Sequence, residues 1–249
     1  MDTKNTSTPQ LRAGYWTWSF QGSDCQILFV GRGPQRQRSQ AFEDLVDDPG
    51  LRLSWPHQIH SATVLEASRP GLCGQADALI TRERGTVLSV ATADCVPIVV
   101  EGRRHLATIH AGWRGLANHI IQQTLDDLTE NPGLARAWIG PAIGPCCYEV
   151  GHDVAGKVVA ASDPNVLTEK EPRPHLDLVG AAKCQLMRAG VEQVHTVSVC
   201  TRCSPEWLWS YRRDRDDAGR NWAFAWRSSD QPADSGTIPD SSAGVAPGA

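Results

Sequence analysis

Residues Thr86 to His110 read TVLSVATADCVPIVVEGRRHLATIH, and this stretch decides the predicted fold. It contains three short apolar runs typical of buried strands, namely Thr86 to Thr92, Val96 to Val100 and His105 to Ile109. Between the last two, Glu101 to Arg104 carries a glycine among charged residues, which predicts a hairpin turn. Cys95 lies at the break before the second run and His110 follows the third. The pattern therefore predicts a thiol and an imidazole at the ends of neighbouring strands.

The surrounding sequence continues the strand pattern and then changes to helical spacing. Further strands are predicted at Gln26 to Val30, Ala62 to Glu66, Ala78 to Thr81, Ala135 to Ile139 and Val194 to Cys200. After Arg114, apolar residues recur with helical spacing at Leu116, Ile120, Leu125 and Leu128. Two more helices are predicted at Gly151 to Ala161 and His175 to Ala189. Early strands and later helices predict an α/β fold (mixed, α+β-like), a domain of mixed β-sheets flanked by helices.

The composition separates one domain from two end regions. Residues 1–10 are polar, and residues 228–249 are rich in Ser, Pro, Ala, Gly and Asp, so we expect a flexible N-terminus and a disordered C-terminal tail. Residues 11–227 show no linker-like change of composition and no internal repeat. This central part is expected to form a single catalytic domain.

Charge and hydropathy limit the classes of partner. The formal net charge of -4 argues against a nucleic-acid binder, which usually carries a basic surplus. No apolar run approaches the roughly 18 residues that span a bilayer. The first ten residues lack the apolar core of a signal peptide. We therefore expect a cytoplasmic protein, monomeric, without a nucleic-acid or membrane partner.

The eight cysteines are expected to be reduced thiols, because the chain carries no export signal and their spacing is irregular. Cys200 and Cys203 form a CxxC pair, but a zinc ribbon needs a second such pair. The adjacent Cys146 and Cys147 are a poor substitute for it, so no structural zinc site is predicted from the spacing.

Two imidazoles and a thiol are the strongest candidates for chemistry. His60, Cys95 and His110 offer the donor set of a three-ligand zinc site with an open position, as in catalytic zinc sites. The same residues are also consistent with a Cys-His nucleophile pair and a helper. Asp94 is a candidate to bind substrate or to orient a ligand. Arg114, at a predicted helix start, is a candidate to bind an anion.

Several motifs occur in an order that resembles the YfiH family, long labelled multicopper polyphenol oxidoreductase (laccase), and the resemblance covers about residues 50 to 225. The motifs are Gln58-Ile59-His60, Ala76-Asp77-Ala78-Leu79, Thr92-Ala93-Asp94-Cys95-Val96-Pro97, His110-Ala111-Gly112-Trp113-Arg114-Gly115, Ile139-Gly140-Pro141-Ala142-Ile143-Gly144, Cys147-Tyr148-Glu149-Val150-Gly151 and Ser210-Tyr211-Arg212-Arg213.

The resemblance implies a fold grouped with toxin-type cysteine hydrolases and a zinc site at His60, Cys95 and His110. It implies phosphorolysis of adenosine, inosine or guanosine, with adenosine deamination and methylthioadenosine cleavage in some members. One branch of the family is linked to peptidoglycan editing. This sequence departs from the family at Ser61, where glycine is usual, and at Val30 to Pro34, a shortened segment in which Arg32 matches the family arginine.

The sequence also tests rival functions. A multicopper oxidase needs paired His-x-His ligands and an axial methionine, whereas this chain has no His-x-His and its methionines are Met1 and Met187. The His-x-Glu of cytidine-type zinc deaminases is also absent, so any deamination would use a different site.

Phosphorolysis needs cationic side chains that hold phosphate, for which Arg114, Arg32 and the Arg212/Arg213 pair are candidates. Arg212, Arg213 and Arg220 are equally consistent with simple pairing to nearby aspartates. We predict a zinc-dependent purine nucleoside phosphorylase. The alternatives are a copper-containing laccase-like oxidoreductase, a Cys-His hydrolase with Cys95 as nucleophile and His110 as base, and a peptidoglycan-editing factor.

Overall fold

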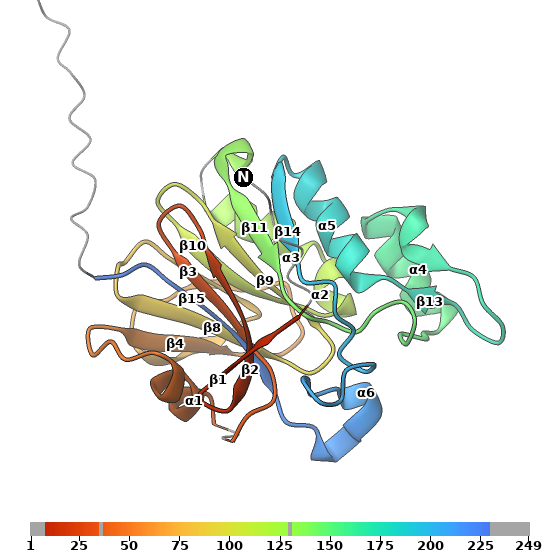
Figure 1. Cartoon of the computed structure of the whole chain (residues 1–249). Helices are drawn as coiled ribbons and strands as arrows, with labels where there is room; N and C mark the ends of the chain where they lie inside the picture. The colour runs from red at the N-terminus through yellow and green to blue at the C-terminus, as the bar shows by residue number, and fades with distance from the viewer. Residues whose placement is uncertain (1–7, 35–36, 129–130, 230–249) are drawn as a thin grey trace, which may run out of the picture.

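The computed structural model describes residues 8–34, 37–128 and 131–229 (Figure 1). Within these residues the chain forms a seven-stranded sheet of order β1-β2-β3-β15-β8-β4-β6 and a six-stranded sheet of order β14-β11-β9-β10-β7-β5. Both sheets mix parallel and antiparallel pairs; β4 pairs with β8 in parallel, whereas β15 pairs with β8 antiparallel. Helices flank the sheets, which confirms the predicted mixed α/β architecture.

The strands of the larger sheet are β1 (Gln10–Arg12), β2 (Tyr15–Gln21), β3 (Gln26–Val30), β4 (Arg52–His57), β6 (Gly71–Gln75), β8 (Thr86–Thr92) and β15 (Asn221–Trp226). Those of the smaller sheet are β5 (Val64–Glu66), β7 (Ala78–Thr81), β9 (Val96–Glu101), β10 (Leu106–Ala111), β11 (Arg136–Ile139) and β14 (Gln193–Thr196). A two-stranded ribbon joins β12 (Leu167–Thr168) to β13 (His175–Leu176). The helices are α1 (Arg38–Leu45), α2 (Trp113–Ala117), α3 (Ile120–Asp127), α4 (His152–Ala161), α5 (Leu178–Arg188) and α6 (Tyr211–Asp214).

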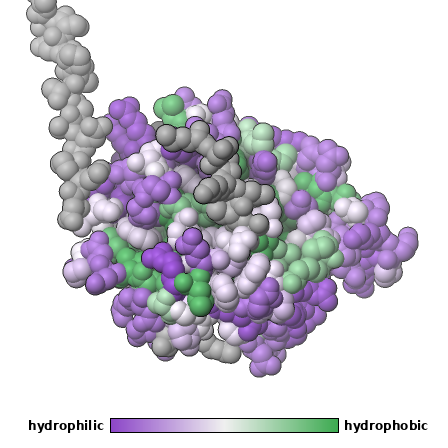
Figure 2. All heavy atoms as spheres, viewed as in Figure 1, coloured by the Kyte–Doolittle hydropathy of each residue, from purple (hydrophilic) through white to green (hydrophobic). Residues whose placement is uncertain are grey.

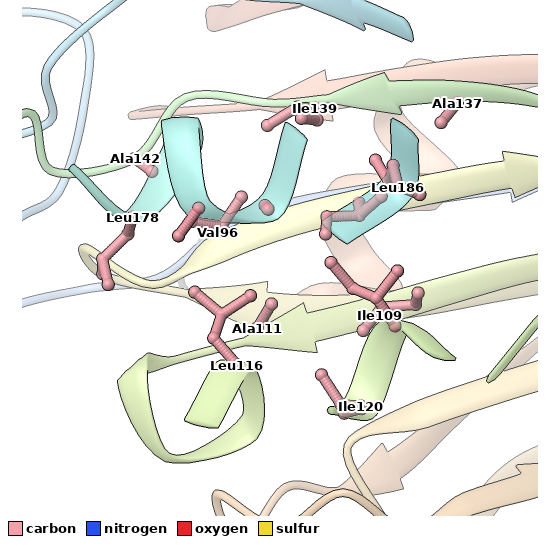
Figure 3. Close-up of a cluster of buried hydrophobic side chains, with 14 of the residues drawn as sticks. Val96, Ile109, Ala111, Leu116, Ile120, Ala137, Ile139, Ala142, Leu178 and Leu186 are labelled. Atoms are coloured by element: carbon pink, nitrogen blue, oxygen red, sulfur yellow. The ribbon is translucent and has the colours of Figure 1, made fainter. Parts of the chain in front are cut away.

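Strand β9 shows how the core is divided into layers. Side chains alternate between the two faces of a strand, so neighbouring residues enter different clusters. Ile98 packs with Leu116, Ile120 and Leu186 beneath α2, α3 and α5, a cluster shown in part in Figure 3. Val99 faces the other way and joins Ile27, Phe29 and Val90 between the two sheets. The central strands are thus buried on both faces, which explains their nearly continuous apolar sequences.

Most of the predicted strands agree closely with the structure, but the strand predicted at Val194 to Cys200 is Gln193–Thr196. Two predicted helical segments also need correction. The helical segment after Arg114 is divided into α2 and α3, because His119 adopts a left-handed conformation with φ 59°. The predicted helix at His175 begins instead at Leu178, because His175 pairs in β13 and Asp177 caps the helix by accepting a hydrogen bond from the Gly180 amide.

The surface and the end regions complete the description. Hydrophilic residues cover most of the face seen in Figure 2, and apolar residues form small separate groups. No helix in the described part of the chain is long and apolar enough to cross a membrane. Of the predicted end regions, residues 1–7 and 230–249 lie outside the described residues, while Gln10 belongs to β1.

Candidate functional site

A cavity of about 520 Å³ opens where the connection between β8 and β9 meets the carboxyl end of β10. Its lining comes from six separate parts of the chain. The lining residues are Gln58, His60, Ala91, Thr92, Ala93, Asp94, Cys95, His110, Trp113, Arg114, Ile143, Tyr148, Leu178, Tyr211, Arg212, Arg215 and Arg220.

The three predicted metal ligands meet in this cavity. The nitrogen and sulfur donor atoms of His60, Cys95 and His110 all lie within 4.8 Å of one another. The two imidazole rings are nearly perpendicular, at 83°, with their centroids 4.8 Å apart. A Cβ atom on Gly112 would lie only 3.0 Å from the Cys95 sulfur and 3.3 Å from the His60 ring. Glycine at this position is therefore needed for the three side chains to approach one another.

A buried carboxylate, Asp77, holds two of these ligands in place. One oxygen lies 2.7 Å from Nδ1 of His110, which leaves Nε2 of that ring for the cavity. The same carboxylate accepts hydrogen bonds from the backbone amides of His60 and Ser61 and from the Ser61 hydroxyl. These bonds stabilise His60 in a left-handed conformation, with φ 59°, that a non-glycine residue rarely adopts. Asp77 thus fixes both the orientation of one imidazole and the loop that carries the other.

Asp77, Cys95 and His110 shift one another's pKa values toward the charged forms. Burial raises the pKa of the Cys95 thiol, but the charge of His110 and hydrogen bonds from His110 and His60 outweigh burial and lower the pKa to about 6. Burial lowers the pKa of His110, whereas the Cys95 charge and the hydrogen bond to Asp77 raise it to about 9. For Asp77, hydrogen bonds from His110 and Ser61 outweigh burial and lower the pKa to about 2. The metal-free site therefore favours a thiolate beside an imidazolium.

The donor set fits a metal with an open coordination position. A thiolate and two imidazoles are ligands that zinc accepts, and three protein ligands leave the fourth position to water or substrate. The open side faces the cavity. The carboxylate behind His110 is the outer partner that metal-bound histidines usually have.

Asp94 lies in the cavity wall, with its side chain engaged in the protein. One carboxylate oxygen accepts from the Thr201 hydroxyl at 2.6 Å, and the other accepts from the Arg212 amide at 2.6 Å. Asp94 itself has φ 102°. Asp94 therefore holds Thr201 and the start of α6 next to Cys95, which places Arg212 at the cavity.

Four arginine side chains contribute to the lining of the cavity. Arg114 is in this lining as predicted, and it is joined by Arg212, Arg215 and Arg220. In the described part of the chain, none of these four guanidinium groups is ion-paired with a carboxylate. These four arginines therefore add positive charge to the cavity, which favours an anionic ligand.

Two other predicted arginines lie outside the lining. Arg32 pairs with Asp214 at 3.1 Å, donates to the Leu208 carbonyl, and stacks 3.7 Å from the centre of a Trp209 ring. Arg213 pairs with the same aspartate at 2.7 Å. The simple aspartate pairing considered from the sequence thus describes Arg213, whereas Arg212 and Arg220 reach the cavity.

Several residues that complete the site were not predicted from the sequence. Tyr148, Tyr211 and Trp113 supply aromatic surface, and Gln58 pairs through its amide with the backbone of Ala91. Burial, followed by the charge of Cys95, raises the pKa of Tyr148 to about 12, against the opposing effect of Arg212. Tyr148 and Asp77 both lie within the quoted motifs, which was the available signal for them.

Comparison with known proteins gives one consistent group of relatives. The family model described as multi-copper polyphenol oxidoreductase laccase matches residues 35–228. A purine nucleoside phosphorylase of Deinococcus radiodurans is 38% identical over 194 residues, which cover 76% of this chain and 74% of that protein. The purine nucleoside phosphorylase YfiH of Escherichia coli K12 is 36% identical over 177 residues, covering 69% of this chain and 72% of that protein.

Solved structures show the same fold. YlmD from Geobacillus stearothermophilus superimposes with a TM-score of 0.78 at 28% identity, covering 88% of this chain and 98% of that one. The Neisseria meningitidis protein NMB0706 gives a TM-score of 0.75 at 26% identity, covering 86% and 99%. The family match spans every residue that lines the cavity.

Proposed function

Since the chain belongs to the YfiH, or multi-copper polyphenol oxidoreductase laccase, family, we propose that it is a zinc-dependent purine nucleoside phosphorylase. One observation carries the proposal: a single cavity combines the His60, Cys95 and His110 donors with four guanidinium groups free of ion pairs among the described residues. The relatives' names supply the substrate class, a purine nucleoside and phosphate.

Phosphorolysis makes three demands on the protein. A phosphate oxygen forms a bond to the anomeric carbon of the ribose while the bond from that carbon to the purine nitrogen breaks. The electron pair leaves with the purine, which takes up a proton. The products are the free base and ribose-1-phosphate. The site must therefore hold phosphate, position the sugar, and donate a proton or hydrogen bond to the departing base.

The arginines of the cavity lining provide groups that can hold phosphate. Arg114 and Arg212 line the same cavity as His60, Cys95 and His110, and guanidinium groups form paired, charge-assisted hydrogen bonds with phosphate oxygens. Asp94 acts as a positioning residue in this proposal, because its two hydrogen bonds hold the Arg212 backbone at the cavity. Arg32, outside the lining, would influence substrate only through Asp214.

Tyr148 is proposed to assist the departing base. Because burial and the Cys95 charge raise its pKa to about 12, the phenol stays protonated near neutral pH and can donate a hydrogen bond. Trp113 and Tyr211 offer aromatic faces on which a purine can stack. The same cavity thus offers groups for both the base and the phosphate.

His60, Cys95 and His110 would hold the zinc ion, with Asp77 orienting His110. When bound, zinc supplies a Lewis acid for a phosphate oxygen or a bound water. Multicopper chemistry needs several histidine-rich sites. Of the two clusters of potential metal ligands among the described residues, only this one contains histidine, so we favour zinc over copper.

A second candidate is a cysteine hydrolase. Asp77, His110 and Cys95 form a carboxylate, imidazole and thiol series like that of cysteine nucleophiles activated by histidine. Such an enzyme needs Cys95 free of metal, so the two proposals make opposite predictions about zinc. Inhibition by a chelator supports the phosphorylase, and activation by a chelator supports the hydrolase.

The decisive experiment measures ribose-1-phosphate released from inosine and adenosine by the zinc-loaded protein, with and without phosphate. Product that requires phosphate and disappears in Cys95→Ala is expected. Cys184→Ser, which removes a thiol on α5 away from the cavity, is the matched control. Inosine formed from adenosine, and adenine formed from methylthioadenosine, would reveal the two side activities proposed for this family. No phosphate-dependent product from folded, zinc-loaded protein would overturn the proposal.

A further inference from the structure

A second group of potential metal ligands lies outside the cavity lining. The sulfur atoms of Cys146, Cys147, Cys200 and Cys203 all lie within 4.8 Å of one another. Each of the four is a free thiol. We propose that these cysteines form a structural zinc site with four thiolate ligands, separate from the site at His60, Cys95 and His110.

The fold brings the two cysteine pairs together through neighbouring strands. Strands β11 and β14 pair in parallel, so the segments that follow them leave the same edge of the sheet. These segments stay together beyond the strands, because Ala142 and Cys200 form a parallel bridge and the Thr201 amide donates to the Ala142 carbonyl at 3.0 Å. The sequence spacing argued against a zinc site only because one pair is adjacent and the other is CxxC.

The distances match a tetrahedral tetrathiolate. A zinc–sulfur bond of about 2.3 Å places the sulfurs of a regular tetrahedron about 3.8 Å apart. The Cys146 and Cys203 sulfurs are 3.7 Å apart, and those of Cys147 and Cys203 are 3.3 Å apart. A disulfide would bring two sulfurs to about 2.05 Å. The sulfur–sulfur distances are therefore close to those that one zinc ion with four thiolate ligands requires, and too long for a disulfide.

The backbone around the cluster is also suited to thiolates. The Gly144 amide donates a hydrogen bond to the Cys200 sulfur at 3.2 Å, the kind of contact that stabilises a metal-bound thiolate. A Cβ atom on Gly144 would lie 3.3 Å from the Cys146 sulfur and 3.4 Å from the Cys200 Cβ. A larger residue at this position would push the two cysteine segments apart.

The site would brace the wall of the cavity. Tyr148 directly follows Cys147, so a metal bound to the cluster fixes the backbone that presents the phenol. Thr201 lies between Cys200 and Cys203 and donates its hydroxyl hydrogen to Asp94. With all four positions occupied by protein, the zinc has no place for substrate and its role is structural.

The test counts zinc by mass spectrometry in wild-type protein and in single variants. Wild type is expected to hold two equivalents, whereas Cys203→Ser and Cys95→Ala each hold one. The matched control Cys184→Ser keeps both. Cys95→Ala loaded with Co²⁺ alone should show the intense sulfur-to-metal absorption and the visible bands of a tetrahedral thiolate site. Absence of bound zinc and cobalt from folded Cys95→Ala would overturn the proposal.

A second measurement needs no variant at the cluster and covers the case in which Cys203→Ser does not fold. Wild-type protein is alkylated with and without a chelator, and the modified cysteines are identified by peptide mass. Zinc should protect all four thiols, and the chelator should expose them. Equal alkylation in both conditions, or a disulfide within the cluster, would overturn the proposal. Because neither readout uses activity, failure here is distinct from failure of the phosphorylase proposal.

Discussion

The two sulfur-containing clusters differ in donors, in burial and in surroundings. The group of His60, Cys95 and His110 has three donors, a buried histidine, a carboxylate behind it and a cavity in front. The group of the four cysteines has four sulfurs, two of them on exposed residues, and lies outside the cavity lining. Three donors beside a cavity leave room for a reactant, whereas four donors close the coordination sphere. The number of ligands and the space beside them thus distinguish the proposed reactive centre from the proposed structural one.

The largest expected effect comes from Cys95→Ala. It removes a donor from the open centre, and we expect kcat/KM for phosphorolysis to fall at least about a hundredfold, the scale seen when a central catalytic group is lost. Steady-state kinetics with inosine and phosphate measures the loss. Cys203→Ser acts on the cavity only indirectly, through the positions of Tyr148 and Thr201, and should cost less. Equal losses in the two variants would erase the distinction between the clusters.

Asp77→Asn should have the next largest effect. The substitution keeps the size of the side chain but removes the charge that accepts from His110 and the His60 loop. Outer partners of metal ligands typically contribute about 10- to 100-fold in metal affinity or activity. Zinc competition with a coloured chelator, run on Asp77→Asn and on Cys203→Ser, should show weakened binding at different sites. Unchanged zinc affinity in Asp77→Asn would contradict the role given to this carboxylate.

Arg212→Ala tests phosphate binding separately, because it leaves both clusters intact. A lost charge-assisted hydrogen bond costs about 1.5–3 kcal/mol, so KM for phosphate should rise about tenfold or more. The KM for inosine should change less, and zinc content should not change. Arg188→Ala, on α5, provides the control, since that side chain pairs with Asp163 away from the cavity. An increase confined to the nucleoside KM would place phosphate elsewhere.

The smallest expected effect is that of Asp214→Asn, at the end of α6, on the free energy of unfolding. The hydrogen bond that Asp214 accepts from Arg213, with the charges of Arg213 and Arg32, lowers its pKa below the usual 3.8. A lowered pKa stabilises the folded state above pH 3.8, and that contribution is lost as the pH falls through the folded-state pKa. Urea unfolding of wild type and Asp214→Asn should differ by about 1 kcal/mol or less at neutral pH, and the difference should shrink in acid. A difference in unfolding free energy that grows in acid would contradict the lowered pKa of Asp214.

Much of the fold and part of the site follow from local sequence. Strands β8, β9 and β10 could be predicted because buried strands need continuous β-branched runs. Cys95 and His110 could be predicted as candidates because they lie where those runs end. His60 was found by its place before a strand. The positions of these residues could be predicted because each depends on its own strand.

The remaining features depend on contacts between distant segments. The cysteine cluster requires the pairing of β11 with β14. The spacing of cysteines within either segment does not predict this pairing. Arg215 and Arg220 reach the cavity because Asp94 binds the Arg212 amide 118 residues away in sequence. Strand β15 alternates alanine with aromatic residues and was not predicted, although it is central in its sheet.

The position of β15 has a consequence for how the protein is made. This strand lies between β3 and β8, yet the ribosome produces it after every other strand and helix described in the domain. Until it emerges, the edges of β3 and β8 that face each other have no partner, and unpaired strand edges promote association between chains. His60, Cys95 and His110 are synthesised long before the larger sheet is complete. A nascent chain stalled before Asn221 should therefore be a client for chaperones that shield exposed edges.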